Sequence, residues 1–309
     1  MKPLIIGSRG SRLALWQSNF IREGIQRKYP DLQVEIAIIK TTGDKISETG
    51  LGGLSGTGKG VFIKEIEEAL LREDVDLAVH SLKDVPTELA PQFTLAAIPP
   101  RADVRDALVA EPNLASWQDL PPGARLGTSS LRRTVQLRLL RKDFEIHTLR
   151  GNVDTRIRKR IELGLDGVVL AAAGLARLGL ERHVACFFPP ELMVPAVGQG
   201  ALAVETRTDD ERVRAAVAHL DDPATRLCTD AERLFLKRMG GGCQVPMGAH
   251  AEIKNGTARF TALLASPTGA DVIRHTYEGK PAHLPELAEK TVEYLLSHGA
   301  ERILKEIQP

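Results

Sequence analysis

The sequence predicts an α/β protein made of two α/β lobes and a small C-terminal α+β domain. Three observations indicate this fold class. Short apolar stretches alternate with segments of helical periodicity, two proline pairs interrupt the alternation, and a hairpin signal opens a last segment of different character. The length of 309 residues agrees with two or three domains.

The first lobe is expected over residues 1–99 and 200–221. Its first helix is indicated by Trp16, Phe20, Ile21 and Ile25, which recur at helical spacing. The predicted elements are a strand over Pro3–Ser8, a helix over Ser11–Tyr29, a strand over Val34–Lys40, a glycine-dense loop over Gly50–Gly60, a helix over Val61–Arg72, and strands over Asp76–His80, Thr94–Ile98 and Ala201–Glu205. No crossover helix precedes the last strand, so we expect it to rejoin this lobe.

The second lobe is expected over residues 100–199, after the boundary at Pro99-Pro100. Helices separate its predicted strands, which favours parallel sheets with crossover helices. These strands cover Ala107–Ala110, Arg125–Gly127, Phe144–Leu149 and Gly167–Ala172. Two lobes joined by two crossings would leave a cleft, a favoured place for ligands.

The C-terminal domain is expected over residues 222–309. It opens with a helix over Pro223–Met239, for which Asp222 is the expected N-cap and Gly240 follows the end. Asn255-Gly256 is a hairpin signal. The further elements are strands over Ala249–Ile253, Ala258–Ala265 and Val272–Tyr277 and a helix over Leu284–Ile307.

Composition narrows the function classes. The net charge of +1 and the aromatic content of 4% argue against a surface that binds nucleic acid throughout. No apolar run reaches the ~18 residues of a membrane span, and the start of the chain has too short an apolar stretch for a signal peptide. The three cysteines lack C-x-x-C spacing, which disfavours a disulfide framework and a cysteine-rich zinc site. A reduced, cytoplasmic enzyme fits best.

Positive charge is concentrated in the second lobe. Residues 125–160 hold eleven Arg or Lys and three Asp or Glu. Arginine dominates, which favours fixed binding of carboxylate or phosphate. A solvated helix face is the plainer interpretation for Arg138, Arg141, Lys142, Arg158, Lys159 and Arg160. Arg132-Arg133 and Arg150 instead follow predicted strands, where anions bind in such folds, and a binding role is favoured for them.

The glycine-dense loop nearly matches a nucleotide-binding loop. In Gly53-Leu-Ser-Gly-Thr-Gly58-Lys59-Gly60, the last position lacks the hydroxyl that would hold magnesium. We therefore interpret it as a lid that carries Lys59, with Phe62 behind it.

Cys243 and Asp84 are the candidates for chemistry. Cys243 lies in a glycine-rich turn past a helix end, where it is either a reactive thiol or an incidental turn residue. Asp84 follows the end of a predicted strand and lies next to Lys83 in sequence. It is either the partner of Lys83 in a local ion pair or a catalytic carboxylate. His80 ends a predicted buried strand and is expected to be structural, and Cys186 and Cys228 are expected to be buried apolar residues.

These segments together resemble porphobilinogen deaminases (hydroxymethylbilane synthases) over almost the whole chain. The motifs are Gly7-Ser-Arg9-Gly-Ser11, Leu13-Ala-Leu-Trp16-Gln17, Gly58-Lys59-Gly60-Val-Phe62, His80-Ser-Leu-Lys-Asp84-Val-Pro86, Arg105-Asp106-Ala107, Gly127-Thr-Ser-Ser-Leu-Arg132-Arg133, Leu149-Arg150-Gly-Asn152-Val-Asp-Thr-Arg156, Ala173-Gly-Leu-Ala-Arg177, Gly198-Gln199-Gly200 and Gly241-Gly242-Cys243. Each motif alone is weak, but the order and spacing are specific.

The resemblance implies lobes like those of periplasmic binding proteins. It also implies a transferase of haem biosynthesis that deaminates four porphobilinogens and condenses them head to tail on a covalent dipyrromethane cofactor. Water then releases the linear tetrapyrrole. Each pyrrole carries an acetate and a propionate, which would explain the arginine concentration.

The resemblance also implies residue roles. Cys243 would hold the cofactor by a thioether, and Asp84 would be a buried catalytic carboxylate that stabilises positive charge. Further cofactor contacts would come from Ser81, Lys83, Thr128, Ser129, Ser130, Arg132, Arg133 and Asn152. Substrate contacts would come from Arg9, Ser11, Arg150, Arg156, Arg177 and Gln199. The family often has proline at Arg12 and a second lid lysine at Ser55, so this chain departs from the family pattern at both positions.

Two other functions stay open from the residues alone. A two-lobed protein that binds a small carboxylate without catalysis would fit the cleft, and residues 125–160 would suit RNA. The resemblance favours porphobilinogen and the growing pyrrole chain as ligands of a monomer, with no nucleic acid and no membrane.

Overall fold

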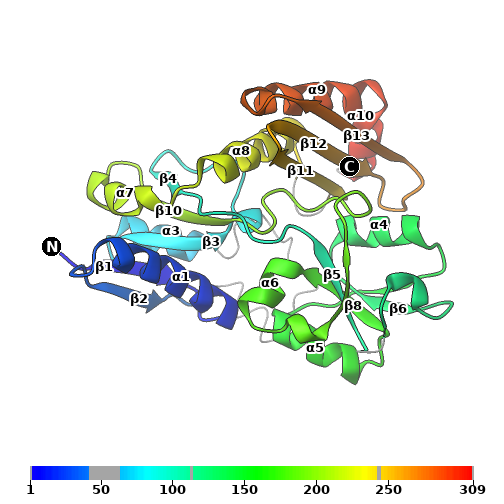
Figure 1. Cartoon of the computed structure of the whole chain (residues 1–309), viewed down its shortest axis with the longest axis horizontal. Coiled ribbons are helices and arrows are strands. Elements are labelled where there is room, and N and C mark those ends of the chain that lie inside the picture. Colours follow the sequence, from blue (N-terminus) through cyan, green and yellow to red (C-terminus); the bar gives the residue numbers. More distant parts are fainter. Residues whose placement is uncertain (1, 42–62, 112–113, 242–244, 308–309) are drawn as a thin grey trace. The chain divides into compact units, whose positions relative to one another are not determined.

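The computed structural model describes residues 2–41, 63–111, 114–241 and 245–307 (Figure 1). By its internal contacts the chain divides into two compact units. Unit 1 comprises Met1–Ala102 and Ala201–Arg226, and unit 2 comprises Asp103–Gly200 and Leu227–Pro309. The predicted fold class is confirmed, because two five-stranded sheets with helices and a separate three-stranded sheet are present in the described residues. The three-domain boundaries and the cleft stay predictions.

Unit 1 contains a mixed sheet in the order β2-β1-β3-β10-β4. Its elements are β1 (Leu4–Ser8), α1 (Arg12–Lys28), β2 (Val34–Ile38), α3 (Lys64–Leu71), β3 (Leu77–Ser81), β4 (Phe93–Ala97), β10 (Leu202–Arg207) and α7 (Glu211–Val217). Strand β1 is parallel to β2 and β3, whereas β10 is antiparallel to β3 and β4. The return of the chain to this lobe after residue 200 is therefore confirmed.

Helix α1 shows how the apolar pattern sorts the side chains. Ile21 and Ile25 are fully buried in the same core cluster as Leu4 of the neighbouring sheet. Trp16 and Phe20 remain 37% and 42% exposed and stack on each other with ring centroids 5.5 Å apart. The predicted helix is therefore confirmed, but of these four residues only Ile21 and Ile25 lie in the core.

Unit 2 contains a second mixed sheet, in the order β7-β6-β8-β5-β9. Its elements are β5 (Asp106–Ala110), β6 (Arg125–Gly127), α4 (Leu131–Leu140), β7 (Glu145–His147), α5 (Val153–Glu162), β8 (Gly167–Ala171), α6 (Ala172–Arg177) and β9 (Val184–Phe188). Strand β6 is parallel to β7 and β8, but β5 runs antiparallel to both of its neighbours. The expectation of a parallel sheet is thus wrong for β5, because local periodicity does not report the direction of the neighbouring strands. Strand β9 was not predicted.

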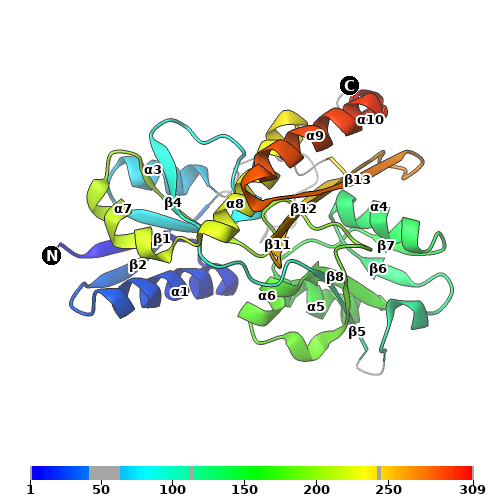
Figure 2. The same cartoon turned by 45° about the horizontal axis from the view of Figure 1, so that its top comes forward.

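The C-terminal part of unit 2 is an antiparallel sheet, β11-β12-β13, with α9 over one face (Figure 2). Asn255 and Gly256 adopt φ of 50° and 76° at the predicted hairpin. Its elements are α8 (Pro223–Arg238), β11 (Met247–Lys254), β12 (Thr257–Ala265), β13 (Val272–Gly279), α9 (Leu284–Ser297) and α10 (Ala300–Ile307). The predicted single helix over Leu284–Ile307 is divided at Gly299, whose φ of +97° no helix contains.

In each five-stranded sheet, the carboxyl ends of parallel strands and the first residue of an antiparallel strand lie at the same edge. In unit 2, the carboxyl ends of β6, β7 and β8 lie together, because these strands are parallel. The reversed β5 places its first residue, Asp106, opposite Ala171 at the end of β8. In unit 1, the first residue of β10, Leu202, lies opposite Ser81 at the end of β3. These two edges carry most of the candidate site residues that the structure describes.

Candidate active site

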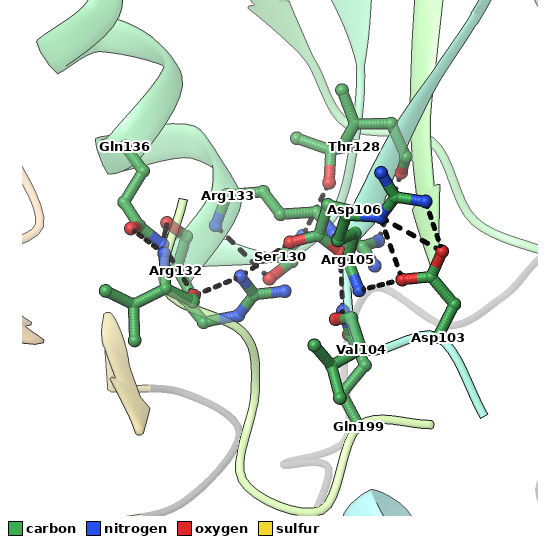
Figure 3. Close-up of polar contacts among 12 residues, drawn as sticks. Asp103, Val104, Arg105, Asp106, Thr128, Ser130, Arg132, Arg133, Gln136 and Gln199 are labelled. Carbon is green, nitrogen blue, oxygen red and sulfur yellow. Dashed lines mark hydrogen bonds and ion pairs between the residues drawn. The ribbon is translucent and has the colours of Figure 1, made fainter. Parts of the chain in front are cut away.

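Arg132 and Arg133, in the first turn of α4, converge on the carboxylate of Asp106 (Figure 3). Arg132 Nη1 donates to Asp106 Oδ2 at 2.7 Å. Arg133 Nε and Nη2 donate to Asp106 Oδ1 at 3.0 and 2.7 Å. The carboxylate is fully buried, and both arginine residues are 5% exposed. These two predicted cofactor ligands therefore belong to one buried ionic cluster.

The electrostatics of this cluster favour the ionised carboxylate. Burial by itself raises the pKa of Asp106, but the charges and hydrogen bonds of Arg132 and Arg133 outweigh it, so the pKa lies well below its usual range. Burial lowers the pKa of Arg133, and the Asp106 carboxylate partly offsets that effect. One carboxylate thus faces two guanidinium groups.

Two buried glutamines complete the cluster. Gln199 Nε2 donates to Asp106 Oδ1 at 3.0 Å and to the Val104 carbonyl at 2.7 Å. Gln136 Oε1 accepts from the Val194 N–H at 2.7 Å, and its Nε2 donates back to the Val194 carbonyl at 3.1 Å. The same carbonyl accepts from Arg132 Nη1 at 2.7 Å. Gln199, predicted as a substrate ligand, here holds Asp106.

The turn between β6 and α4 is held by hydrogen bonds to the side chains of its own residues. Ser130 caps α4, because its side chain accepts from the Arg133 N–H at 3.4 Å. Thr128 is buried, and its hydroxyl accepts from the Ser130 N–H at 3.2 Å. Ser129 between them is exposed. The Gly127-Thr-Ser-Ser segment therefore builds the helix start that presents both arginines.

The start of α5 presents a second group of predicted ligands. Arg150 and Asn152 are exposed, and Asn152 occupies the N-cap position without a side-chain cap bond. Arg156 Nε donates to the Gly151 carbonyl at 2.7 Å. Gly151 has a φ of +127°, and a Cβ there would lie 2.8 Å from Thr155 Cγ2, so glycine is required at this turn.

Arg177 ends α6, which follows β8. Its Nη2 donates to the Gly200 carbonyl at 2.7 Å, next to Gln199. Burial lowers the pKa of Arg177 to about 10. This predicted substrate ligand is therefore half-buried and braces the turn through Gly198-Gln199-Gly200.

In unit 1, the predicted ligands follow the parallel strands β1 and β3. Ser81 ends β3, and its hydroxyl accepts from Gln17 Nε2 at 2.8 Å. Ser11 caps α1, accepting from the Ala14 N–H at 3.3 Å. Arg9, between β1 and α1, is half-buried. Ser11 and Ser81 thus shape the edge of the sheet through bonds within the chain.

Asp84 ends a short 3-10 turn, Leu82–Asp84, directly after β3. Leu82 and Val85 point into the core at 1% and 7% exposure, whereas Asp84 is exposed and Lys83 is half-buried. The expectation of a buried carboxylate is wrong for this structure, because the flanking apolar residues take the inward positions of the turn.

A solvated position was predicted for six other basic residues of the stretch 125–160, and most of them are at least partly exposed. Arg138, Lys142 and Arg158 are exposed, and Arg141 and Lys159 are half-buried. The prediction is wrong for Arg160, which is buried and donates from Nη2 to Glu111 Oε1 at 2.8 Å.

His80 has the structural role that was expected. It is buried, and its Nε2 lies 2.8 Å from Oε2 of the fully buried Glu205 of β10. Cys228 is buried as predicted, whereas Cys186 is only half-buried. Three further predicted residues, Lys59, Phe62 and Cys243, lie outside the described residues, as does Ser55.

Asp106 is the residue that the sequence analysis missed as a site residue. In the sequence, Asp106 stands in the Arg105-Asp106-Ala107 motif, which contributes to the family resemblance. One available signal was an acid at the start of an apolar strand, since a fully buried carboxylate needs cationic partners. Its neighbour Arg105 pairs separately with Asp103, with Nη2 and Oδ2 2.7 Å apart.

Family models and curated proteins give consistent matches. The model described as "Porphobilinogen deaminase, dipyromethane cofactor binding domain" matches residues 4–215, and "Porphobilinogen deaminase, C-terminal domain" matches residues 226–296. The porphobilinogen deaminase of Pelobacter propionicus is 46% identical over 306 residues, covering 99% of this chain and 97% of that protein. That of Syntrophobacter fumaroxidans is 46% identical over 302 residues, covering 98% and 97%.

Among solved structures, the methionine-binding protein MetQ aligns with a TM-score of 0.46 at 12% identity, covering 70% of this chain and 89% of that chain. In the described ranges, every helix is too short or too polar to cross a bilayer.

Proposed function

The chain belongs to the porphobilinogen deaminase family, and on this premise we propose that it deaminates four porphobilinogen molecules and condenses them head to tail into hydroxymethylbilane. It is then a transferase of tetrapyrrole biosynthesis with a dipyrromethane cofactor. The observation that carries the proposal is the match to both family models, which together cover nearly the whole chain.

The donor set of unit 2 fits the proposed cofactor. Each pyrrole ring carries carboxylate side chains, and guanidinium groups bind carboxylates with two parallel hydrogen bonds. Arg132 and Arg133 stand at a helix start, with Ser129 exposed beside them. When bound, dipyrromethane supplies a covalent anchor and the pyrrole carbon to which new rings are added.

We assign the residues of this chain the following roles. Cys243 forms the thioether, since a thiolate is a strong nucleophile toward carbon. Asp84 stabilises the positive charge that develops on the reacting pyrroles. The cofactor is bound by Ser81, Lys83, Thr128, Ser129, Ser130, Arg132, Arg133 and Asn152, and its carboxylates accept hydrogen bonds from the cationic side chains of this set. Incoming substrate is bound by Arg9, Ser11, Arg150, Arg156, Arg177 and Gln199.

The exposure of Asp84 supports its role. A carboxylate at the end of β3, on a turn fixed by buried Leu82 and Val85, is held in place while its oxygens stay accessible to a ligand. The pyrrole N–H groups are the donors it would accept from.

The test combines an activity assay with intact mass. Wild-type protein incubated with porphobilinogen should release ammonia and a linear tetrapyrrole and carry the mass of one dipyrromethane. Asp84→Asn should lower turnover at least ~100-fold while the protein stays folded. Asp74→Asn is the matched control, because Asp74 forms an exposed ion pair with Arg72 of the same unit and such pairs contribute little. A near-normal rate for Asp84→Asn would remove it from the mechanism.

Cys243→Ser should lose both the added mass and activity, whereas Cys186→Ser should keep them. An active Cys243→Ser enzyme would contradict the thioether assignment. Following the family resemblance, we also propose a cytoplasmic monomer that acts without nucleic acid. Size-exclusion chromatography with light scattering and a salt titration with RNA test the last two points.

A further inference from the structure

Asp106 occupies the centre of the buried cluster, and both of its oxygens are used. Oδ1 accepts from Arg133 and Gln199, and Oδ2 accepts from Arg132 (Figure 3). The partners come from helix α4 and from the segment that precedes β10. A single carboxylate therefore fixes side chains that are 26, 27 and 93 residues away in sequence.

The cluster carries a surplus of one positive charge. It contains two guanidinium groups and one carboxylate, and its glutamines are neutral. The charged neighbours Arg105 and Asp103 neutralise each other. Because a buried unpaired charge is unfavourable, the surplus favours the binding of one anion.

The two arginines differ in the donors that the protein itself uses. Arg133 donates through Nε and Nη2 to Asp106 and through Nη1 to the Val169 carbonyl at 3.0 Å. Arg132 donates through Nη1 alone, counting partners in the described part of the chain. The donors that remain for a ligand are therefore mainly those of Arg132.

We propose that Asp106 is a positioning residue that fixes both guanidinium groups and neutralises one of their charges, so that the cluster presents one positive charge, through Arg132, to a single carboxylate of the pyrrole chain. The proposal rests on the proposed function, which supplies the carboxylates. It refines that function, because Arg133, assigned above to the cofactor, then acts on it by holding Asp106, and Arg132 donates to it directly.

The test uses full-length apoprotein produced without porphobilinogen, and follows covalent loading by intact mass after porphobilinogen is added. Asp106→Asn should load about 10–100-fold more slowly than wild type, as misplaced binding groups do. Asp143→Asn is the matched control and should load at the wild-type rate, since Asp143 pairs with Arg141 and neither residue belongs to the cluster or to its charged neighbours.

A second readout separates charge from general damage. Sodium acetate should inhibit the loading of Asp106→Asn at a several-fold lower concentration than it inhibits wild type, at constant ionic strength, because the variant has two surplus charges. A merely structural defect would slow loading without changing this sensitivity. Unchanged loading together with unchanged sensitivity would overturn the proposal.

If Asp106→Asn does not fold, the double variant Asp106→Asn/Arg133→Met tests the charge count instead. It returns the cluster to one surplus positive charge, that of Arg132. Recovery of folded protein with slow loading supports the charge count, and failure to fold overturns it. Wild-type protein that does not load would instead refute the proposed function, so the two failures are distinguishable.

Discussion

Glu232 is a buried carboxylate whose loss should damage unit 2 in a measurable way. It lies in α8 and is fully buried. Its Oε2 accepts from the Gly198 N–H at 2.7 Å, and its Oε1 accepts from the Ala251 N–H at 2.8 Å. One side chain thus connects the turn that carries Gln199 to strand β11.

The substitution Glu232→Gln replaces one acceptor oxygen with an NH₂ donor of nearly equal size. One backbone N–H then faces a donor and loses its partner. An unsatisfied buried group costs about 1–3 kcal/mol, and weakening the other, charge-assisted bond costs about 1 kcal/mol more. We expect a loss of about 2–4 kcal/mol in the free energy of unfolding, or roughly 4–16 °C in Tm.

Differential scanning calorimetry of both proteins measures this shift. Glu289→Gln is the matched control, because Glu289 pairs with Arg238 at 2.8 Å with side chains 36% and 58% exposed, and such surface pairs contribute little. If Glu232→Gln unfolds within about 1 °C of the control, the two backbone bonds do not stabilise the fold as reasoned here.

Two further predictions concern binding and pH. Arg150→Leu should leave the fold intact, since Arg150 is exposed, and should slow chain extension; intact-mass spectra would show accumulated short intermediates, and a normal spectrum would exclude Arg150 from the site. Burial and the charge of Glu205 raise the pKa of Glu67 above its ordinary value of 4.5, more than His80 lowers it. A carboxyl with a raised pKa stabilises the fold below its unfolded pKa and loses that contribution as pH rises through the folded pKa. Glu67→Gln should therefore gain Tm relative to wild type between pH 4 and pH 7, and a constant difference over that range would contradict the assignment.

Much of the fold was readable from local signals. The hairpin at Asn255-Gly256 and the Asp222 cap of α8 follow from residue chemistry at fixed positions. Asp222 Oδ1 accepts from the Thr225 N–H at 2.7 Å, as an N-cap should. Strand direction was less accessible, because the apolar pattern of β5 is the same whether its neighbours are parallel or antiparallel.

The site shows the same division. The sequence placed Arg132 and Arg133 at a helix start after a strand, and the structure has them there. It could not supply their partner, because Asp106 and Arg132 are 26 residues apart and meet only through the reversal of β5. The exposure of Asp84 was missed for a similar reason, since burial depends on which neighbours take the inward positions.

In the fold, acidic residues from outside the stretch 125–160 pair with its basic residues and lower the net positive charge of this region. Asp106, Glu111 and Glu162 lie outside that stretch and pair with basic residues inside it, which removes three of its eight surplus charges. Arg141 also pairs with Asp143 inside the stretch. A surface that attracted any polyanion would gain from leaving these charges unpaired. A site that recognises carboxylates one at a time gains from neutralising most of them and fixing the few that face the ligand, because each fixed guanidinium then binds in one geometry. The pairing pattern therefore favours an arginine arrangement selected for position, which is what a chain of carboxylated rings extended by one unit at a time requires.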